Sequence, residues 1–297
     1  MLDWARRSCW FLWSVPLGRA QALCVLYALH ADKHNPSIDM NPTLYGLVFA
    51  GGLFLGMLLL LETGRRIAIR RLAQDPEGAR EGLGVVEGAV FSLLGLLIAF
   101  TFSGAATRFE GRRHLIVEEA NDIGTAYLRI SVLPASAQPA LRELFRQYLD
   151  SRLETYRKLP DVAAAKAELE RSLKFQGEIW SNAVEACRGS GSQPAHMLLL
   201  PALNAMFDIT TTRTEATKNH PPSIIFAMIG VLSLAAALLA GYGMAGGKLR
   251  SWVHIVGFAA VMALTIYVIV DIEYPRLGMI RVADADRVLL ELRESMK

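Results

Sequence analysis

The sequence has too few cysteines for a disulfide framework or a thiolate metal site. The three that occur, Cys9, Cys24 and Cys187, are odd in number and lie far apart. The sequence also lacks an excess of charge of one sign, because 31 basic residues stand against 28 acidic ones. A dedicated nucleic-acid binder needs surplus positive charge to neutralise phosphates, so the balance argues against that class.

Motifs typical of common enzymes are missing as well. The sequence contains no glycine-rich phosphate loop, no nucleophile elbow and no cysteine–histidine pair, and its six histidines show no spacing typical of a metal site. We therefore predict no catalytic residue, no metal, no cofactor and no enzyme activity.

Apolar residues, in contrast, are abundant. They make up 53% of the 297 residues, and 20% are charged, which suits neither an ordinary soluble domain nor a protein buried wholly in lipid. Four apolar runs are long enough to cross a hydrocarbon core, which takes about 20 residues. These runs cover about 43–61, 85–106, 223–243 and 251–270. The sequence thus predicts an integral membrane protein in contact with the lipid bilayer.

The spans form two hairpins, 40–106 and 223–270, which are separated by residues 107–222. This middle segment shows helical spacing of apolar residues and no strand-like alternation. The predicted fold class is therefore all-α: a polytopic membrane protein with four transmembrane helices and a helical extramembrane domain between the second and third. A tail, 271–297, follows the last span.

Residues 1–39 fit neither a span nor a clear signal peptide. Their apolar stretches are near ten residues each and are split by Arg19, and no suitable small-x-small cleavage site follows Arg6 and Arg7. Two interpretations remain open. The first is a leader that is cleaved, and the second is a physiological start at Met40, with residues 1–39 as upstream sequence or a disordered, interfacial lead. We favour the second.

One stripe of residues continues from the second span into the domain. Its members recur in alternating steps of four and three, which is a 3.5-residue period. They are Gly88, Ser92, Gly95, Ala99, Phe102, Ala106, Phe109, Arg113, Ile116, Ala120, Ile123, Tyr127 and Ile130. The pattern predicts one helix over 85–133, roughly 70 Å long at about 1.5 Å per residue. Inside the membrane the residues of the stripe are mostly small. This favours one of two roles: close packing against another helix, or lining of a lumen that is narrowed at Phe102.

The residues of this span that could line or gate a pore are Ser92, Ala99, Phe102 and Ser103. Hydrophobic rings can gate by dewetting, and hydroxyl groups can hydrogen-bond a partly dehydrated anion. The alternative interpretation is interfacial aromatics together with hydroxyls that bond back to their own helix.

Two charged residues are further candidates. Arg113 could draw anions into a vestibule, or it could form an ion pair with Glu110, which is within helical reach. Glu87 is the only carboxylate in a predicted span and is a functional candidate for that reason. Because it lies near an end of the span, the alternative is that it reaches the headgroups.

Polar residues also gather where the spans meet the domain. We predict a membrane-proximal latch of ion pairs between the end of the last span and the start of the domain, and the alternative is a plain membrane stop. Its candidate members are Arg108, Asp271, Glu273 and Arg276. A second polar group, Glu118, Glu119, Asn121 and Asp122, is expected to be a solvated helix face.

A resemblance to a known family rests on residues 93–134, LLGLLIAFTFSGAATRFEGRRHLIVEEANDIGTAYLRISVLP. Together with residues 271–282, DIEYPRLGMIRV, this stretch resembles the bestrophin-like domain family of bacterial membrane proteins. That family is distantly similar to the bestrophins, which are pentameric anion channels. The resemblance implies a homo-oligomer in the bacterial inner membrane, with the second span around a pore for small inorganic anions. The acidic calcium-binding run of animal bestrophins has no counterpart here, so calcium gating is not expected.

Two functions therefore stand as hypotheses. The first is an oligomeric ion channel or pore that conducts anions. The second is a membrane-anchored sensor or scaffold whose helical domain binds a partner, with spans that associate through small residues such as Gly52 and Gly56. The orientation stays open, because the basic short loops place the domain outside the cytoplasm whereas the resemblance places it inside.

Overall fold

The computed structural model describes residues 42–75, 82–190, 193–246 and 252–296. The chain divides into two units, Met1–Met40 and Asn41–Lys297, and the second unit is described below. The predicted lead, 1–39, lies outside the described residues.

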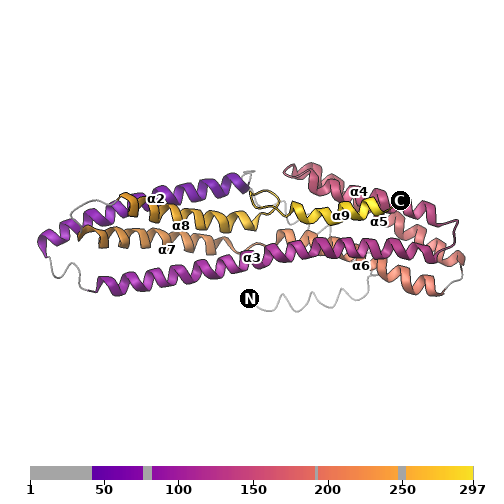
Figure 1. The fold of residues 1–297 in the computed structure, drawn as a ribbon, viewed down its shortest axis with the longest axis horizontal. Helices are drawn as coiled ribbons and strands as arrows, with labels where there is room; N and C mark the ends of the chain where they lie inside the picture. Colours follow the sequence, from indigo (N-terminus) through magenta and orange to yellow (C-terminus); the bar gives the residue numbers. More distant parts are fainter. Residues whose placement is uncertain (1–41, 76–81, 191–192, 247–251, 297) are drawn as a thin grey trace, which may run out of the picture. The chain divides into compact units, whose positions relative to one another are not determined.

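The described residues form α-helices and short 3₁₀ turns, and they contain no strand. The helices are α2 (Pro42–Gln74), α3 (Leu83–Arg129), α4 (Gln138–Arg157), α5 (Val162–Ser190), α6 (Gln193–Lys218), α7 (Ser223–Gly243), α8 (Trp252–Glu273) and α9 (Arg287–Ser295) (Figure 1). Within the described ranges, four helical segments are long and apolar enough to cross a membrane. The predicted all-α class with four spans is confirmed.

The membrane half is a four-helix bundle. Helices α7 and α8 each pack against both α2 and α3, whereas α2 and α3 share no extensive contact and therefore occupy opposite corners. The buried centre of the bundle is apolar and includes Met57, Leu61, Ile229, Ala259 and Ile266. A corner helix buries one side against its two neighbours, and its other side is left for lipid or another protein.

Glycines allow α2 and α7 to approach until their backbones touch. A Cβ atom on Gly64 would collide with the carbonyl oxygen of Leu238, and one on Gly241 would collide with the carbonyl oxygen of Leu61. Small residues permit such close crossings between transmembrane helices. Gly52, which we considered as a contact between spans, makes no such close approach, because a Cβ atom added there would have no neighbour within 4 Å.

Helix α3 connects the membrane half to the extramembrane domain without a break. It spans 47 residues, and the first proline after its start is Pro134. Leu133, directly before this proline, is extended with φ −82° and ψ 160°, as expected for a residue that precedes proline. The predicted single helix is confirmed as far as Arg129, and the last residues of the predicted range form the 3₁₀ turn Ile130–Val132.

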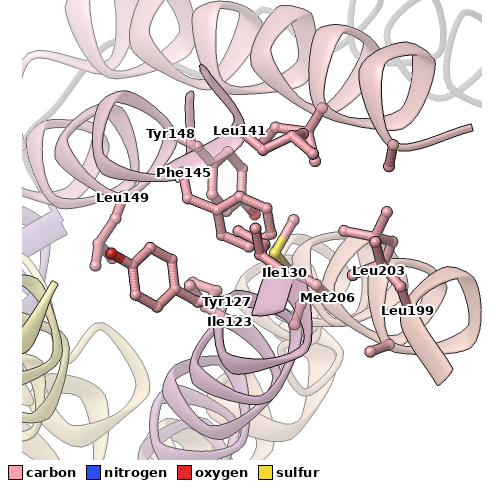
Figure 2. Packing of buried hydrophobic residues seen from close by; sticks show 14 of the residues in the cluster. Ile123, Tyr127, Ile130, Leu141, Phe145, Tyr148, Leu149, Leu199, Leu203 and Met206 are labelled. Atoms are coloured by element: carbon pink, nitrogen blue, oxygen red, sulfur yellow. The ribbon is translucent and has the colours of Figure 1, made fainter. Parts of the chain in front are cut away.

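The extramembrane domain has its own core (Figure 2). Helix α3 packs on α6 and α9, α4 packs on α5 and α9, and α5 packs on α6. The buried side chains that meet there include Ile123, Tyr127, Ile130, Leu141, Phe145, Tyr148, Leu149, Leu199, Leu203 and Met206. The second half of α3 is therefore a central element of this core.

Candidate functional site

The stripe predicted on the second span lies on a free face of α3 inside the membrane half. Ser92, Gly95, Ala99 and Phe102 are all exposed, and Phe102 is 44% exposed. Among the 18 most apolar consecutive residues of this helix, 6% are buried, against 33% for α8. This face of α3 is thus open to lipid or to a second copy of the chain.

The opposite side of α3 carries the contacts with the bundle. Leu94, Thr101 and Ala105 are at most 7% exposed, and the Thr101 hydroxyl donates to the carbonyl of Leu97 at 2.7 Å. Ser103 is exposed. The alternative interpretation, a hydroxyl that hydrogen-bonds to its own helix, therefore holds for Thr101, which lies on the packed face.

Beyond the membrane the same stripe becomes core. Ile116, Ala120 and Ile123 are at most 4% exposed and pack inside the domain. The same periodic stripe therefore lies in two environments. In the domain α3 packs on α6 and α9, whereas in the membrane half the stripe stays exposed.

Arg113 lies between these two parts of α3. Its Nη1 is 2.9 Å from Oε1 of Glu110, and the two side chains are 50% and 65% exposed. The ion pair offered as an alternative for Arg113 is present. Exposed ion pairs of this kind contribute little to stability. The pair therefore opens readily, and the Arg113 guanidinium is accessible to ions in the solvent.

Glu87 packs against the end of α7. A Cβ atom on Gly243 would lie 2.6 Å from Glu87 Oε1. This oxygen is buried and has no hydrogen-bond partner among the described residues. The glycine at position 243 therefore leaves space for the Glu87 carboxylate.

Where α3 leaves the membrane, Arg108 pairs with Glu273, the last residue of α8. Arg108 Nε lies 2.9 Å from Oε1 and 3.2 Å from Oε2 of Glu273. The Glu273 side chain is 1% exposed and that of Arg108 is 26% exposed. This contact joins two members of the predicted latch.

One turn further, Arg112 caps two helices at once. Its Nε and Nη2 donate to the carbonyls of Ala216 and Asn219, at 3.1 and 3.0 Å, where α6 ends. Its Nη1 donates to the carbonyl of Glu273 at 2.8 Å, where α8 ends. The last carbonyls of a helix lack donors within the helix, and the guanidinium supplies them. Sequence reasoning missed Arg112, although its spacing of four from Arg108 places both on one face.

His220 completes this junction from the segment between α6 and α7. Its Nδ1 lies 3.5 Å from Oε2 of Glu273, and its ring stacks on Tyr274 with centroids 4.6 Å apart. The junction therefore gathers two guanidiniums and an imidazole around Glu273: Arg108 and His220 lie at its buried carboxylate, and Arg112 binds its backbone carbonyl.

The other two predicted latch residues have different partners. Asp271 accepts hydrogen bonds from the backbone N–H groups of Met279 and Ile280, at 2.9 and 2.8 Å. A Cβ atom on Gly278 would collide with this carboxylate. Arg276 pairs with Asp286. Asp271 and Arg276 thus shape the segment after α8 and do not pair with the Arg108 region, which differs from the predicted latch.

The prediction of a solvated face was wrong for Glu119. Its side chain is wholly buried and pairs with Arg152 of α4 and Arg213 of α6. Helical spacing could not reveal this, because both partners come from other helices. No group of three or more histidine, cysteine or acidic side chains suited to a metal ion occurs in the described residues.

These features define a helical membrane protein with four spans, whose second span continues as the central helix of an extramembrane domain. The family model of the Bestrophin-like domain matches residues 66–286. The chain belongs to this family, which supports a membrane channel as the class of protein.

Solved structures of similar fold come from a bacterial bestrophin homolog of Klebsiella pneumoniae. One variant of that homolog is 13% identical with a TM-score of 0.63, and the match covers 82% of this chain and 95% of that one. A second variant is 14% identical with a TM-score of 0.59, and the match covers 80% and 98% of the two chains. At this identity the likeness establishes the fold alone. No curated protein matches the chain by sequence.

Proposed function

We propose that the protein is an oligomeric ion channel of the bacterial inner membrane, with a pore lined by the membrane half of α3. The observation that carries the proposal is the free face of α3. This helix is the least buried of the four spans that the described residues form, yet the stripe on its free face is made of small residues, Ser92 among them, and a phenylalanine.

In a ring of subunits, the free face of α3 would line the central lumen. If α3 lies next to the symmetry axis, α2 at the opposite corner of the bundle meets the lipid. Exposed apolar side chains on α2, such as Leu59 at 70%, suit that environment. A closed ring repeats the stripe around one lumen, so each stripe residue becomes a ring of side chains. A pentamer, as in bestrophins, is the proposed assembly.

Along such a lumen the side chains differ in what they offer an ion. Ser92 and Ser103 carry hydroxyl groups that can replace part of a hydration shell, and Ala99 leaves width between them. Phe102 would form an apolar constriction that gates by dewetting. Half-exposed Arg113 follows on the domain side and favours anions, although Glu110 offsets part of its charge. Small inorganic anions are the proposed ions.

The junction around Glu273 is the proposed mechanical link between pore and domain. Arg108 and Arg112 lie on α3, directly after the stretch that would line the pore, and they hold the ends of α6 and α8. A shift of α3 along the axis would therefore move the domain and the last span together.

A sensor or scaffold remains the second candidate function, and exposed apolar side chains of the aqueous domain favour it. Leu128 and Met197 are 72% and 73% exposed, and Arg129 Nη1 donates to the carbonyl of Leu198, which brings the end of α3 beside the start of α6. Such a patch could receive a partner protein.

The subunit count of the detergent-solubilised protein tests the proposed channel. Native mass spectrometry gives the count, and electron-microscopy images give the symmetry and the helix nearest the axis. We expect a closed ring of at least four subunits, about the smallest that leaves an axial lumen between helices, with α3 innermost. A monomer or dimer, or a ring with α2 at its axis, would overturn the proposal in favour of the scaffold.

A further inference from the structure

A second charged cluster lies inside the extramembrane domain, apart from the junction at the membrane. Glu119 of α3 and Arg152 of α4 are 0% exposed, and Arg213 of α6 is 5% exposed. Arg152 Nε donates to Glu119 Oε1 at 2.6 Å, and Arg213 pairs with the other carboxylate oxygen. Two guanidiniums from different helices thus converge on one buried carboxylate.

A third guanidinium, that of Arg276, contacts the same cluster at the ring of Tyr156. The Cζ atoms of Arg213, Arg276 and Arg152 lie 4.3, 4.4 and 5.4 Å from the ring centroid. Aromatic faces attract cations, and the Tyr156 hydroxyl also accepts a hydrogen bond from Arg152 Nη2 at 2.8 Å. Arg276 belongs to the segment after α8, so the cluster ties that segment to α4 and α6.

Positive charge exceeds negative charge in this cluster by one. Its guanidiniums belong to Arg152, Arg213 and Arg276, and its carboxylates belong to Glu119 and Asp286, the partner of Arg276. Arg152, Arg213 and Glu119 are almost fully enclosed, whereas the side chains of Arg276 and Asp286 are each 17% exposed. An uncompensated charge in the enclosed part is unfavourable unless a counter-charge is near. Burial, together with the charge of Arg276, lowers the pKa of Arg213 to about 9, so this guanidinium stays protonated at neutral pH.

Two buried guanidinium nitrogens of the cluster make no hydrogen bond to the described residues, and one of them, Arg213 Nη1, lies against Glu119 Oε2 in the ion pair. Arg152 Nη1 is buried and makes no hydrogen bond to any residue that the structure describes. The side chain is itself wholly enclosed, and it lies beside the Tyr156 ring and the other two guanidiniums. A buried donor of this kind is unfavourable unless an acceptor is supplied.

We propose that the Tyr156 cluster, defined as Glu119, Arg152, Tyr156, Arg213, Arg276 and Asp286, binds one small monovalent inorganic anion such as chloride. A single negative charge balances the single excess positive charge and supplies the acceptor that Arg152 Nη1 lacks. A divalent anion would leave the cluster with a net negative charge, and a phosphate ester is too large for groups enclosed to this degree. The anion binds by a small adjustment of side chains around Arg152.

This site is separate from the proposed conduction path. Arg152 and Glu119 lie in the interior of the domain, whereas the proposed pore face of α3 is exposed. The anion would therefore be a resident ion that holds α3, α4, α6 and the segment after α8 together. The proposal does not depend on whether the protein conducts ions.

Thermal unfolding of the full-length protein in detergent tests the site. The melting temperature is measured in sodium chloride, sodium bromide and sodium gluconate at equal ionic strength, because gluconate is too large to enter. We expect a saturable rise of several degrees in chloride and bromide. In crystals soaked with bromide, we expect an anomalous peak within hydrogen-bond distance of Arg152 Nη1.

Variants that change the charge balance in opposite directions sharpen the test. Arg276→Gln removes the excess charge and should abolish the halide-dependent rise, whereas Glu119→Gln increases the excess charge and should enlarge it. Arg157→Gln is the matched control, since Arg157 is on α4 like Arg152, is 77% exposed, and pairs with Glu154 three residues earlier. It should keep the wild-type rise.

Two results would overturn the proposal. The first is equal melting temperatures of the wild-type protein in chloride and gluconate, together with no bromide peak at the cluster. The second is a halide-dependent rise that survives Arg276→Gln, with bromide peaks on the free face of α3. If Glu119→Gln fails to fold, the bromide peak and Arg276→Gln still decide the matter.

Discussion

The guanidinium of Arg108 on α3 lies against the carboxylate of Glu273 at the end of α8, with Nε 2.9 Å from Oε1. This pair links two helices whose residues are 165 positions apart in the chain. It sits where both helices leave the membrane half, and Arg112 binds the same residue through its backbone carbonyl. The junction therefore connects the part of α3 that we propose to line a pore with the extramembrane domain.

The Arg108–Glu273 pair should show strong energetic coupling. In a double-mutant cycle with Arg108→Met and Glu273→Gln, we expect a coupling energy of about 1–3 kcal/mol in the free energy of unfolding, because the carboxylate is almost fully buried. Arg108→Met combined with Asp271→Asn is the control, and it should be additive within about 0.5 kcal/mol, since Asp271 bonds to Met279 and Ile280 instead. Coupling to Asp271 without coupling to Glu273 would contradict the observed pairing.

Arg112→Lys should destabilise the protein although the charge is kept. A lysine ammonium is a point donor and cannot reach the carbonyls of Ala216, Asn219 and Glu273 together, so we expect a loss of about 2–4 kcal/mol. Thermal unfolding in detergent measures the loss. Arg113→Lys, one residue further and half exposed, should change stability by less than about 0.5 kcal/mol. Similar melting temperatures for the two variants would show that the caps at α6 and α8 contribute little.

The crossing of α2 and α7 should not tolerate even one added methyl group. Gly241→Ala places a carbon against the carbonyl oxygen of Leu61, and backbone atoms cannot move aside as a side chain can. We expect a loss of about 2 kcal/mol or more in stability, or a failure to fold. Gly51→Ala on α2 is the control, because nothing lies within 4 Å of the added atom. The yield of folded protein and its melting temperature are compared for the two variants.

Ion flux should depend on the stripe of α3 and not on the rest of the helix surface. In reconstituted liposomes, Phe102→Ala should raise flux severalfold by widening an apolar constriction, and Ser92→Ala should alter it by removing a hydroxyl group. Phe100→Ala is the matched control: Phe100 is 68% exposed, and two residues turn its side chain by about 200° from Phe102. If Ser92→Ala and Phe102→Ala leave flux unchanged, or if Phe100→Ala has the same effect as Phe102→Ala, α3 does not line a pore with this stripe.

The class of the protein follows from local features of the sequence. Runs of about 20 apolar residues are sufficient to span a bilayer, and helix is the structure that satisfies every backbone group within one segment. The length of α3 was predictable for an equally local reason, because no proline interrupts it before Pro134. These properties depend on neighbours along the chain.

The partners of each helix face were decided only by the tertiary structure. Ala99 and Ile116 belong to one periodic stripe, yet the first is exposed and the second is buried, because α6 and α9 pack on α3 only outside the membrane. Glu119 fits a solvated face by spacing, but Arg152 and Arg213 arrive from distant segments and enclose it. Spacing along a helix determines which residues share a face. Long-range packing determines whether that face contacts another helix, lipid or water.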